Sequence, residues 1–167
     1  IELGNVNLEE EDVHLTSIFD ECQTLVKERS SKANIEITIE CPEELPRFSL
    51  DRLKIKQIIL NLLTNSIKFT DPGGIVKITA GLNDYQELEI RVSDNGIGIP
   101  PDDIQWVTQP FTQVAESKTR NHEGTGLGLS IAKSFIELHQ GELIIDSTLG
   151  RGTTICLRFP PKRTKNF

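Results

Sequence analysis

The stretch HEGTGLGLS, residues 122–130, places three glycines at alternate positions directly before a segment with helical periodicity. Glycine accepts positive φ and lets a bulky group approach the backbone, and a helix N-terminus offers free N–H groups that suit an anion. Two common phosphate-binding patterns do not fit, because Leu129 occupies the last glycine position of GxGxxG and no Gly-Lys-Ser/Thr follows. The stretch therefore argues against a dinucleotide-binding or P-loop fold. Two interpretations stay open: a glycine-rich hinge or turn, and an anion-binding loop of another fold.

Length and charge narrow the class of protein. The 167 residues are 37% hydrophobic and carry a net charge of −7, which fits one globular domain and argues against a nucleic-acid partner. No run of about twenty apolar residues is present, so we expect no direct membrane insertion. The three cysteines form no CxxC pair, as is typical of reduced thiols, and we expect a cytoplasmic protein. Because the chain begins at Ile1 and contains no methionine, we expect a segment of a longer polypeptide.

Hydrophobic periodicity predicts the order of helices and strands. The strand pairs adjoin in the sequence, so we expect a mixed, mostly antiparallel sheet. The helices lie apart from most of the strands, which indicates an α+β protein, a two-layer α/β sandwich with helices on one face. The expected elements are helices over 15–29, 51–69, 102–109 and 127–139, strands over 33–40, 75–82, 85–93, 141–147 and 153–159, a short strand near Val13, a loop over 41–48 and a mobile loop over 112–126.

A second glycine-containing stretch, SDNGIGIP, follows the predicted strand 85–93. Asp94 stands at the strand end, and Gly96 and Gly98 follow at a spacing of two. A carboxylate beside such a loop can accept a hydrogen bond from an amino group of a ligand. The alternative is an ordinary turn in which Asp94 bonds its own backbone.

Polar residues also gather on one face of the long predicted helix. Asn61, Asn65 and Lys68 are spaced four and three apart and share that face. The bland interpretation is the solvated stripe of an amphipathic helix, but asparagine is a mediocre helix former and such a stripe would favour Glu, Lys or Gln. Amide oxygens suit Mg²⁺, amide N–H groups suit phosphate, and Lys68 adds a cation. A fourth stretch, GRGTT at 150–154, is by itself an ordinary hairpin turn.

Taken in order, these stretches resemble the catalytic ATP-binding domain of sensor histidine kinases. That domain has the Bergerat fold, shared with gyrase, heat-shock chaperone and mismatch-repair ATPases. The resemblance covers residues 13–160 and implies a two-layer α/β sandwich with a mobile ATP lid. NLLTNSIKFT is similar to the N box, DNGIGIP to the G1 box, PFTQ to the F box, GTGLGLSI to the G2 box and GRGT to the last glycine box.

The resemblance implies ATP or ADP and Mg²⁺ as ligands. Asn65 would coordinate Mg²⁺, Asn61 would help to hold phosphate and metal, and Lys68 would reach ribose or phosphate; these three would be the catalytic residues. The adenine amino group would bond to Asp94. The residues implied for nucleotide binding are Asp94, Gly96, Gly98, Phe111, Gly124, Thr125, Gly126, Leu127, Gly128 and Thr153.

One position separates the functions within this superfamily. The ATP-hydrolysing relatives carry Glu at the position aligned with Asn61, where it acts as a general base on water. An amide lacks the basicity for that role, so the site would keep the γ-phosphoryl group for an acceptor. This favours the kinase over an ATPase of the gyrase or chaperone type. A kinase-dead regulatory module and an anti-sigma-like serine kinase stay open as alternatives.

The acceptor histidine of the family stands in a motif similar to His-Glu-Leu-Arg-Thr-Pro-Leu, which this chain lacks. His14 has no acidic neighbour or proline, His122 lies in the expected lid, and we expect His139 to be a surface or capping residue. The phosphoacceptor is therefore expected on a separate dimerisation/histidine phosphotransfer domain, with a downstream response regulator as a further partner. The F box departs from the family, because Thr108 stands where the family has Phe, and we expect Trp106 to pack in its place.

Three segments are expected on this basis. Residues 1–12 would be a remnant of the linker from the dimerisation helices, 13–160 the ATP-binding catalytic domain, and 161–167 a basic, disordered tail or linker.

Overall fold

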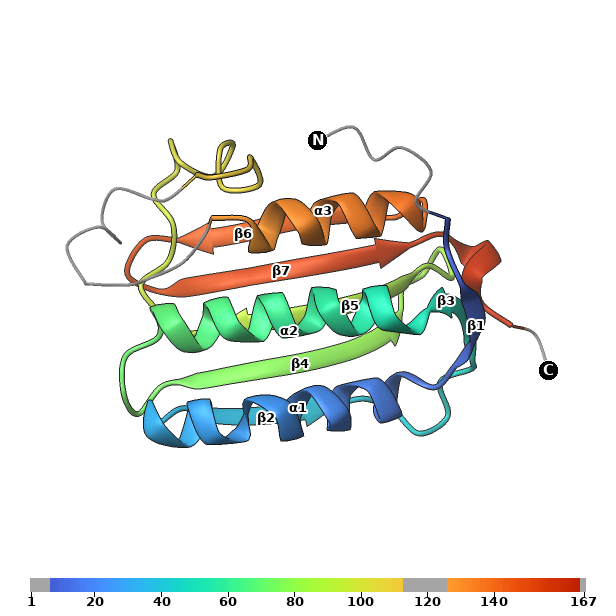
Figure 1. The fold of residues 1–167 in the computed structure, drawn as a ribbon, viewed down its shortest axis with the longest axis horizontal. Helices are drawn as coiled ribbons and strands as arrows, with labels where there is room; N and C mark the ends of the chain where they lie inside the picture. The colour runs from blue at the N-terminus through green and yellow to red at the C-terminus, as the bar shows by residue number, and fades with distance from the viewer. Residues whose placement is uncertain (1–6, 113–125, 166–167) are drawn as a thin grey trace.

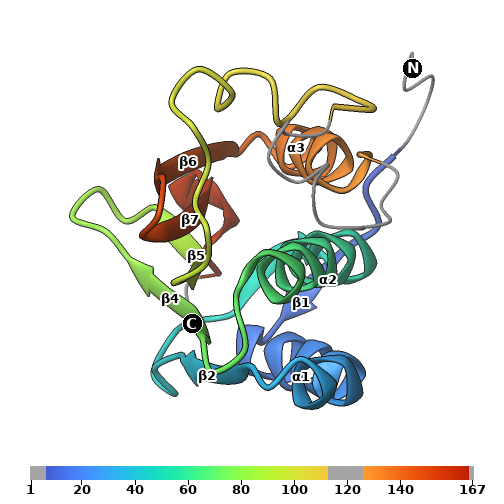
Figure 2. The same ribbon diagram turned by 90° about the vertical axis from the view of Figure 1, so that its left-hand side faces the viewer.

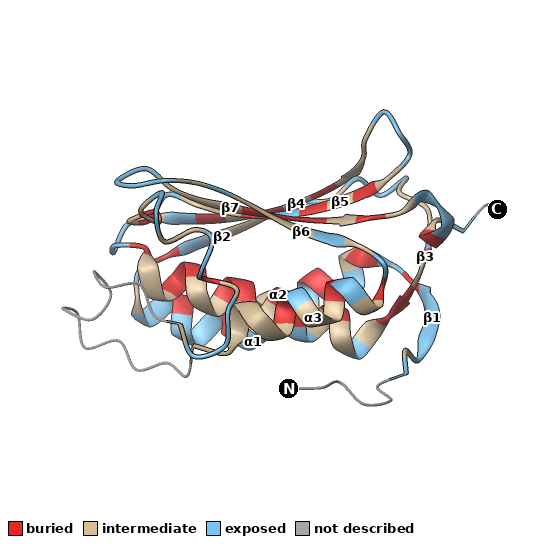
Figure 3. Ribbon diagram, turned by 90° about the horizontal axis from the view of Figure 1, so that it is seen from above, coloured by how far each residue is buried: buried red, intermediate tan, exposed pale blue. Residues whose placement is uncertain are grey.

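The computed structural model describes residues 7–112 and 126–165, and these form two layers. One layer is a five-stranded sheet, and the other consists of three helices that all cover the same face of it (Figures 1 and 3). The expected α+β sandwich is confirmed. The elements are β1 (Glu10–Val13), α1 (Leu15–Lys32), β2 (Glu36–Glu40), β3 (Phe48–Asp51), α2 (Arg52–Phe69), β4 (Ile75–Leu82), β5 (Leu88–Asp94), α3 (Gly128–Leu138), β6 (Glu142–Thr148), β7 (Gly152–Phe159) and the 3-10 turn η2 (Pro161–Arg163).

The sheet has the strand order β2-β4-β5-β7-β6. β2 pairs with β4 in parallel, and the other three pairings are antiparallel, so the sheet is mixed and mostly antiparallel as expected. Ile78, Ile90 and Leu157 are fully buried, because alternate strand residues point to the helical layer. The opposite face carries ion pairs such as Lys77–Glu40, at 2.6 Å. One face of the sheet therefore forms the core, and the other is polar.

Helix α2 is the middle helix of its layer (Figure 2). It begins after Asp51, whose carboxylate accepts a hydrogen bond from the Lys54 N–H at 3.0 Å, a standard N-cap that satisfies a free helix donor. Ile55, Ile59 and Leu63 are completely buried, which matches the helical spacing of the apolar residues. The polar face of α2 is thereby turned away from the sheet. Within the described residues no helix has the length and apolar character needed to cross a membrane.

Two local predictions were wrong. Residues 102–109 form consecutive turns rather than a helix, with i→i+3 bonds such as Trp106 N–H to Asp103 O at 2.9 Å. Only Val107 is buried in this segment, so no apolar stripe holds a helix there. Strand β3 was not predicted. It pairs antiparallel with β1, and β1 confirms the short strand expected near Val13.

Both ends of the described chain pack on the domain beyond the expected limits of 13 and 160. Residues 10–12 belong to β1. Arg163 is only 6% exposed, its Nε donates to the His139 carbonyl at 3.1 Å, and the Lys165 N–H donates to the Arg47 carbonyl at 2.8 Å. The expectation of a disordered tail is therefore wrong for residues 161–165, because these bonds order the backbone.

His139 differs from its predicted place at the surface. It caps the C-terminus of α3, which is one of the two roles expected for it. It is not a surface residue, because it has no exposed area. Its ring packs edge-on against Phe159, with 5.9 Å between the ring centroids. Hydrogen bonds to both ring nitrogens make this burial tolerable.

Candidate functional site

Asp94 is the last residue of β5, where it pairs with Thr153 of β7. Its Oδ1 accepts hydrogen bonds from the Gly96 N–H at 3.0 Å and the Thr153 N–H at 3.2 Å, and its Oδ2 accepts one from the Ser66 hydroxyl at 2.9 Å. Burial raises the pKa of Asp94 above its ordinary value of 3.8, and the three hydrogen bonds oppose that rise. Asp94 thus bonds its own turn, as one interpretation proposed, and is also held by α2 and β7.

The loop after Asp94 lies against two other segments of the chain, and its glycines make this approach possible. A Cβ at Gly96 would stand 2.4 Å from the Phe69 carbonyl oxygen at the end of α2. Gly98 has φ +70°, and a Cβ there would stand 2.1 Å from the Thr148 carbonyl oxygen. Both distances are far below van der Waals contact, so the path of this loop requires glycine at both positions.

Two residues of this region, Ser66 and Ser147, were not predicted from the sequence. Ser66 lies in the apolar stripe of α2 and is 6% exposed. A polar residue within such a stripe indicates a hydrogen-bond partner in the fold, because buried hydroxyls have partners. Ser147 of β6 lies 2.8 Å from the Thr153 hydroxyl and accepts the Ile99 N–H at 2.8 Å. No short motif contains Ser147, so only the sheet register brings it here.

The asparagines of α2 face the first residue of α3. The Asn61 Nδ2 donates to the Gly128 carbonyl at 3.1 Å, and the Asn61 Oδ1 accepts from the Gln57 Nε2 at 3.0 Å. A Cβ on Gly128 would lie 3.8 Å from the Asn65 Nδ2. Leu127, at the N-cap of α3, makes no side-chain cap, and the N–H groups of a helix start suit an anion.

Of the two asparagines that face α3, Asn65 has the side-chain oxygen that is open to a metal ion. Among the described residues, no group of three or more His, Cys, Asp or Glu residues is placed to hold a cation. The Asn61 oxygen already accepts the Gln57 amide, whereas no hydrogen bond joins the Asn65 side chain to another described residue. Mg²⁺ commonly takes one or two protein oxygens and completes its shell with phosphate and water. The residues present therefore fit a Mg²⁺ ion that arrives with a phosphate group and uses Asn65.

Lys68 lies farther along α2 than the two asparagines. Its ammonium group stands over the Phe69 ring, 5.0 Å from the centroid. Burial lowers the pKa of Lys68, and repulsion from Arg29 of α1 lowers it further. Its contact with ribose or phosphate stays a prediction.

The F box contacts the start of the G2 box. The Phe111 N–H donates to the Gly126 carbonyl at 3.1 Å, which joins the two ends of the segment expected to form the lid. Phe111 is 73% exposed, and Trp106 is 53% exposed, so Trp106 does not fill the place of the missing phenylalanine. Gly124, Thr125 and His122 lie outside the described residues.

The predicted residues thus form two adjoining groups. Asp94, Gly96, Gly98 and Thr153 lie together where β5 ends and β7 begins. Asn61, Asn65, Gly126, Leu127 and Gly128 lie where the polar face of α2 meets the start of α3. Ser66 connects the groups, because it follows Asn65 on α2 and binds Asp94. The arrangement offers a half-buried acceptor at one end and amide groups for an anion at the other.

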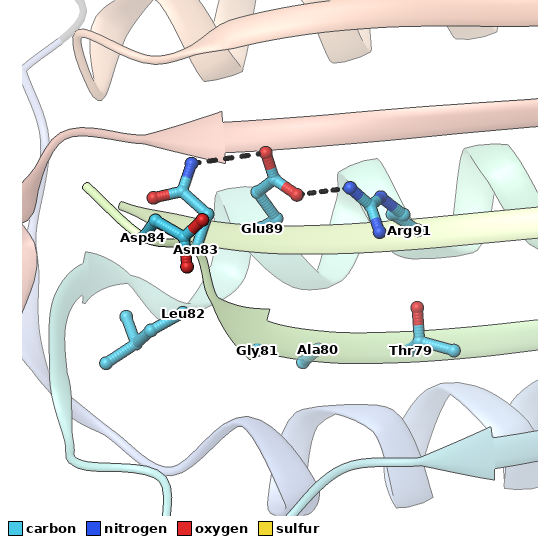
Figure 4. Close-up of a pocket in the computed structure, with 8 residues that line it drawn as sticks. All are labelled: Thr79, Ala80, Gly81, Leu82, Asn83, Asp84, Glu89 and Arg91. Atoms are coloured by element: carbon cyan, nitrogen blue, oxygen red, sulfur yellow. Dashed lines mark hydrogen bonds and ion pairs between the residues drawn. The ribbon is translucent and has the colours of Figure 1, made fainter. Parts of the chain in front are cut away.

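A separate hollow lies on the polar face of the sheet, at the turn between β4 and β5 (Figure 4). Two of its charged groups are paired with each other: Glu89 accepts from Arg91 and also, at 3.3 Å, from the Asn83 amide. The helices cover the other face of the sheet (Figure 3). This hollow is therefore not part of the site at Asp94.

Comparisons with known proteins identify the family of the chain. The model of the family described as "Histidine kinase-, DNA gyrase B-, and HSP90-like ATPase" matches residues 50–163. Histidine protein kinase DivJ of Caulobacter vibrioides is 41% identical over 136 residues, 81% of this chain and 22% of DivJ. The chain spans between 16% and 30% of the length of curated relatives that it matches.

Solved structures give the same result. Full-length ShkA in complex with AMPPNP superposes with a TM-score of 0.86 at 26% identity, over 98% of this chain and 33% of that one. The nucleotide-free catalytic domain of histidine kinase ThkA superposes with a TM-score of 0.79 at 29% identity, over 92% of this chain and 97% of that one. ThkA was also solved in complex with the response regulator protein TrrA. The family match covers most of the chain, and the chain therefore belongs to the family of histidine kinase-, DNA gyrase B- and HSP90-like ATPases.

Proposed function

We propose that this domain binds Mg-ATP and transfers the γ-phosphoryl group to a histidine of a separate dimerisation/phosphoacceptor domain in two-component signalling. The observation that carries the proposal is the pair Asn61 and Asn65 facing the start of α3, with an amide at position 61. An amide can hold phosphate but cannot take a proton from water. The site therefore suits transfer to an acceptor better than hydrolysis.

The base of the nucleotide is assigned to the end of β5. The Asp94 Oδ1 already accepts two backbone N–H groups, whereas its Oδ2 accepts, from the described residues, only the Ser66 hydroxyl. A carboxylate oxygen has room for a second donor, and the exocyclic amino group of adenine supplies one. Gly96 and Gly98 keep the loop backbone close to the base.

The phosphates are assigned to the start of α3. Its uncapped N–H groups and the positive end of its dipole favour negative charge. Asn65 offers its oxygen to Mg²⁺, which when bound neutralises charge on the phosphate oxygens. Asn61 bridges Gln57 and Gly128 and so fixes the start of α3 beside the phosphates. A lone pair of the acceptor imidazole then forms the N–P bond while the bond from Pγ to the bridging oxygen breaks, and ADP leaves.

The partners follow from the relatives. DivJ is named a histidine protein kinase and is much longer than this chain, so we place the acceptor histidine in the remainder of the parent protein. ThkA binds a response regulator, and we place such a regulator downstream of this domain too. Lys68 is proposed to reach ribose or phosphate, and Gly124 and Thr125 to join the lid over the triphosphate.

Phosphotransfer tests the proposal directly. The domain is mixed with γ-labelled ATP, Mg²⁺ and the separately expressed dimerisation domain of the parent protein, with an acceptor His→Gln variant as the control. We expect label on the wild-type acceptor and little release of free phosphate without it. Rapid phosphate release without an acceptor would indicate an ATPase. Nucleotide binding without either reaction would indicate a kinase-dead module.

A further inference from the structure

A polar cluster joins α2 and α3 at the end of the helical layer where β1, β3 and η2 lie, at the right of Figure 1. There the Asp51 N–H donates to the His139 Nε2 at 3.0 Å. Asp51 caps the start of α2 and His139 caps the end of α3. Toward the other end of α3, Asn61 bonds the Gly128 carbonyl. The antiparallel helices α2 and α3 are therefore joined by one hydrogen bond at each end of α3.

The bond at His139 requires a neutral imidazole. A backbone N–H can only donate, so Nε2 must accept from Asp51. The His139 Nδ1 lies 2.7 Å from the Phe135 carbonyl oxygen, which can only accept, so Nδ1 carries the proton. The ring has no exposed area. A second proton on Nε2 would face the Asp51 N–H and break the bond.

Charged groups from four segments surround this ring. Arg163 of η2 binds the His139 carbonyl at 3.1 Å, and Glu10 of β1 pairs with Arg163. Asp51, before α2, is neutralised by the Lys54 ammonium at 2.6 Å. Burial is the largest cause that lowers the pKa of His139 and Arg163 adds to it, while the Phe135 hydrogen bond and the charges of Asp51 and Glu10 act in the opposite direction.

We infer that His139 is a positioning residue for the nucleotide site: its neutral ring holds the end of α3 against α2, and its protonation releases α3 and weakens nucleotide binding. The link is mechanical, because α3 is a rigid helix whose other end carries Gly128, against Asn61 and Asn65. The inference rests on the proposed nucleotide site. By linkage, a nucleotide that prefers the neutral form must also raise the acid dissociation constant of His139 by the same factor, and so lower its pKa.

The first test compares wild type with His139→Gln, whose amide oxygen accepts the Asp51 N–H but does not titrate. Dissociation constants for AMPPNP with Mg²⁺ are measured from pH 8 to about pH 5.5. Titration of the nucleotide and of Asp94 affects both proteins alike, so it cancels in the ratio of the two constants. We expect similar affinities at pH 8 and a wild type that becomes weaker than the variant by a factor that grows as the pH falls, because the lowered pKa of His139 confines its protonation to the acid end. A constant ratio would overturn the inference.

The second test needs no substitution at His139. The ring resonances of His139 are followed by NMR through a pH titration of the wild-type domain, with and without saturating Mg-AMPPNP, and assigned against His14→Gln and His122→Gln. We expect nucleotide to shift the midpoint of His139 to lower pH. An unchanged midpoint despite saturation would overturn the inference. Absence of binding to the wild type at pH 8 would instead contradict the proposed nucleotide site.

Discussion

At the scale of single residues, the Asp94 carboxylate lowers the stability of the folded domain at neutral pH, although it is the group proposed to bind the nucleotide. Its carboxylate is partly withdrawn from water, and burial raises its pKa above 3.8. Because the folded state prefers the protonated form, the contribution of this group to stability is complete below about pH 3.8 and is lost as the pH rises through the folded-state pKa. At neutral pH the ionised Asp94 therefore destabilises the nucleotide-free domain.

Replacement of Asp94 by asparagine is expected to relieve this cost. The amide oxygen can keep the two bonds from Gly96 and Thr153, and the Ser66 hydroxyl can turn to accept from the new amide. We predict that Asp94→Asn is as stable as wild type or more stable in urea at pH 7, with the difference shrinking toward pH 4. Exposed Asp84→Asn is the control. A large loss of stability in Asp94→Asn alone would show that the carboxylate supports the fold.

The residue types in the sequence predicted much of this candidate site, but two of its residues were not predicted. Asp94, Gly96 and Gly98 were found because a carboxylate at a strand end and alternate glycines form a local pattern. Ser66 was hidden among apolar neighbours, and Ser147 is joined to Asp94 only through Thr153 of the next strand. Partners that come from strand register cannot be found in a short motif.

At the scale of elements, the glycines of the motifs are not equivalent. Gly98 has φ +70° and no space for a Cβ, whereas a Cβ on Gly128 would meet Asn61 only at 3.8 Å, an ordinary contact. Gly128 is also the first residue of a helix, where alanine is more favourable than glycine. Gly98 is thus required by the backbone conformation, whereas Gly128 leaves space beside the asparagines.

Alanine at each position should separate these roles. We predict that Gly98→Ala loses at least about 2 kcal/mol of unfolding free energy, from backbone strain and collision with the Thr148 carbonyl. Gly128→Ala should be neutral or gain up to about 1 kcal/mol. Urea denaturation of both variants at the same pH measures the difference. Equal losses would mean that the path of the loop at Gly98 is not as described.

The long elements were predicted because each buries a repeated apolar stripe. Helix α2 and strands β4, β5 and β7 have that pattern and lie within a few residues of the expected bounds. β3 has only four residues, too few for a period of two to be distinguished from a loop. The turns at 102–109 were mistaken for a helix because the segment opens with aspartates, which often cap helices, although little apolar surface follows.

At the scale of the whole molecule, the two ends of the described chain are joined. Arg163 of η2 pairs with Glu10 of β1 and donates to the Ser49 carbonyl at 3.3 Å, and Lys165 pairs with Asp12 at 3.3 Å. The segment that enters the domain and the segment that leaves it thus share one cluster beside α2 and α3. This tertiary pairing was not predicted, because a short basic sequence by itself resembles a linker.

Truncation measures how much the bonds between the two ends of the described chain contribute to the free energy of unfolding. A chain that ends at residue 160 loses Arg163 and leaves the His139 carbonyl and Glu10 without their partner. We predict a loss of about 2 kcal/mol of unfolding free energy, because the truncation removes the buried Arg163 side chain together with its hydrogen bonds to the His139 and Ser49 carbonyls. The matched control ends at residue 165 and should be as stable as the full chain. Equal stability of both truncations would show that η2 contributes nothing.

The central claim is that this fold holds Mg-ATP between Asp94 and the start of α3. Calorimetric titration with AMPPNP, with and without Mg²⁺, tests it most directly, beside Asp94→Asn and the control Asp84→Asn. We predict one-to-one binding that Mg²⁺ alters, unchanged in the control and weaker by about ten- to a hundredfold in Asp94→Asn, since one hydrogen bond to a charged group is lost. Equal affinity of Asp94→Asn and wild type would contradict the assigned base pocket, and no binding at millimolar nucleotide would contradict the site as a whole.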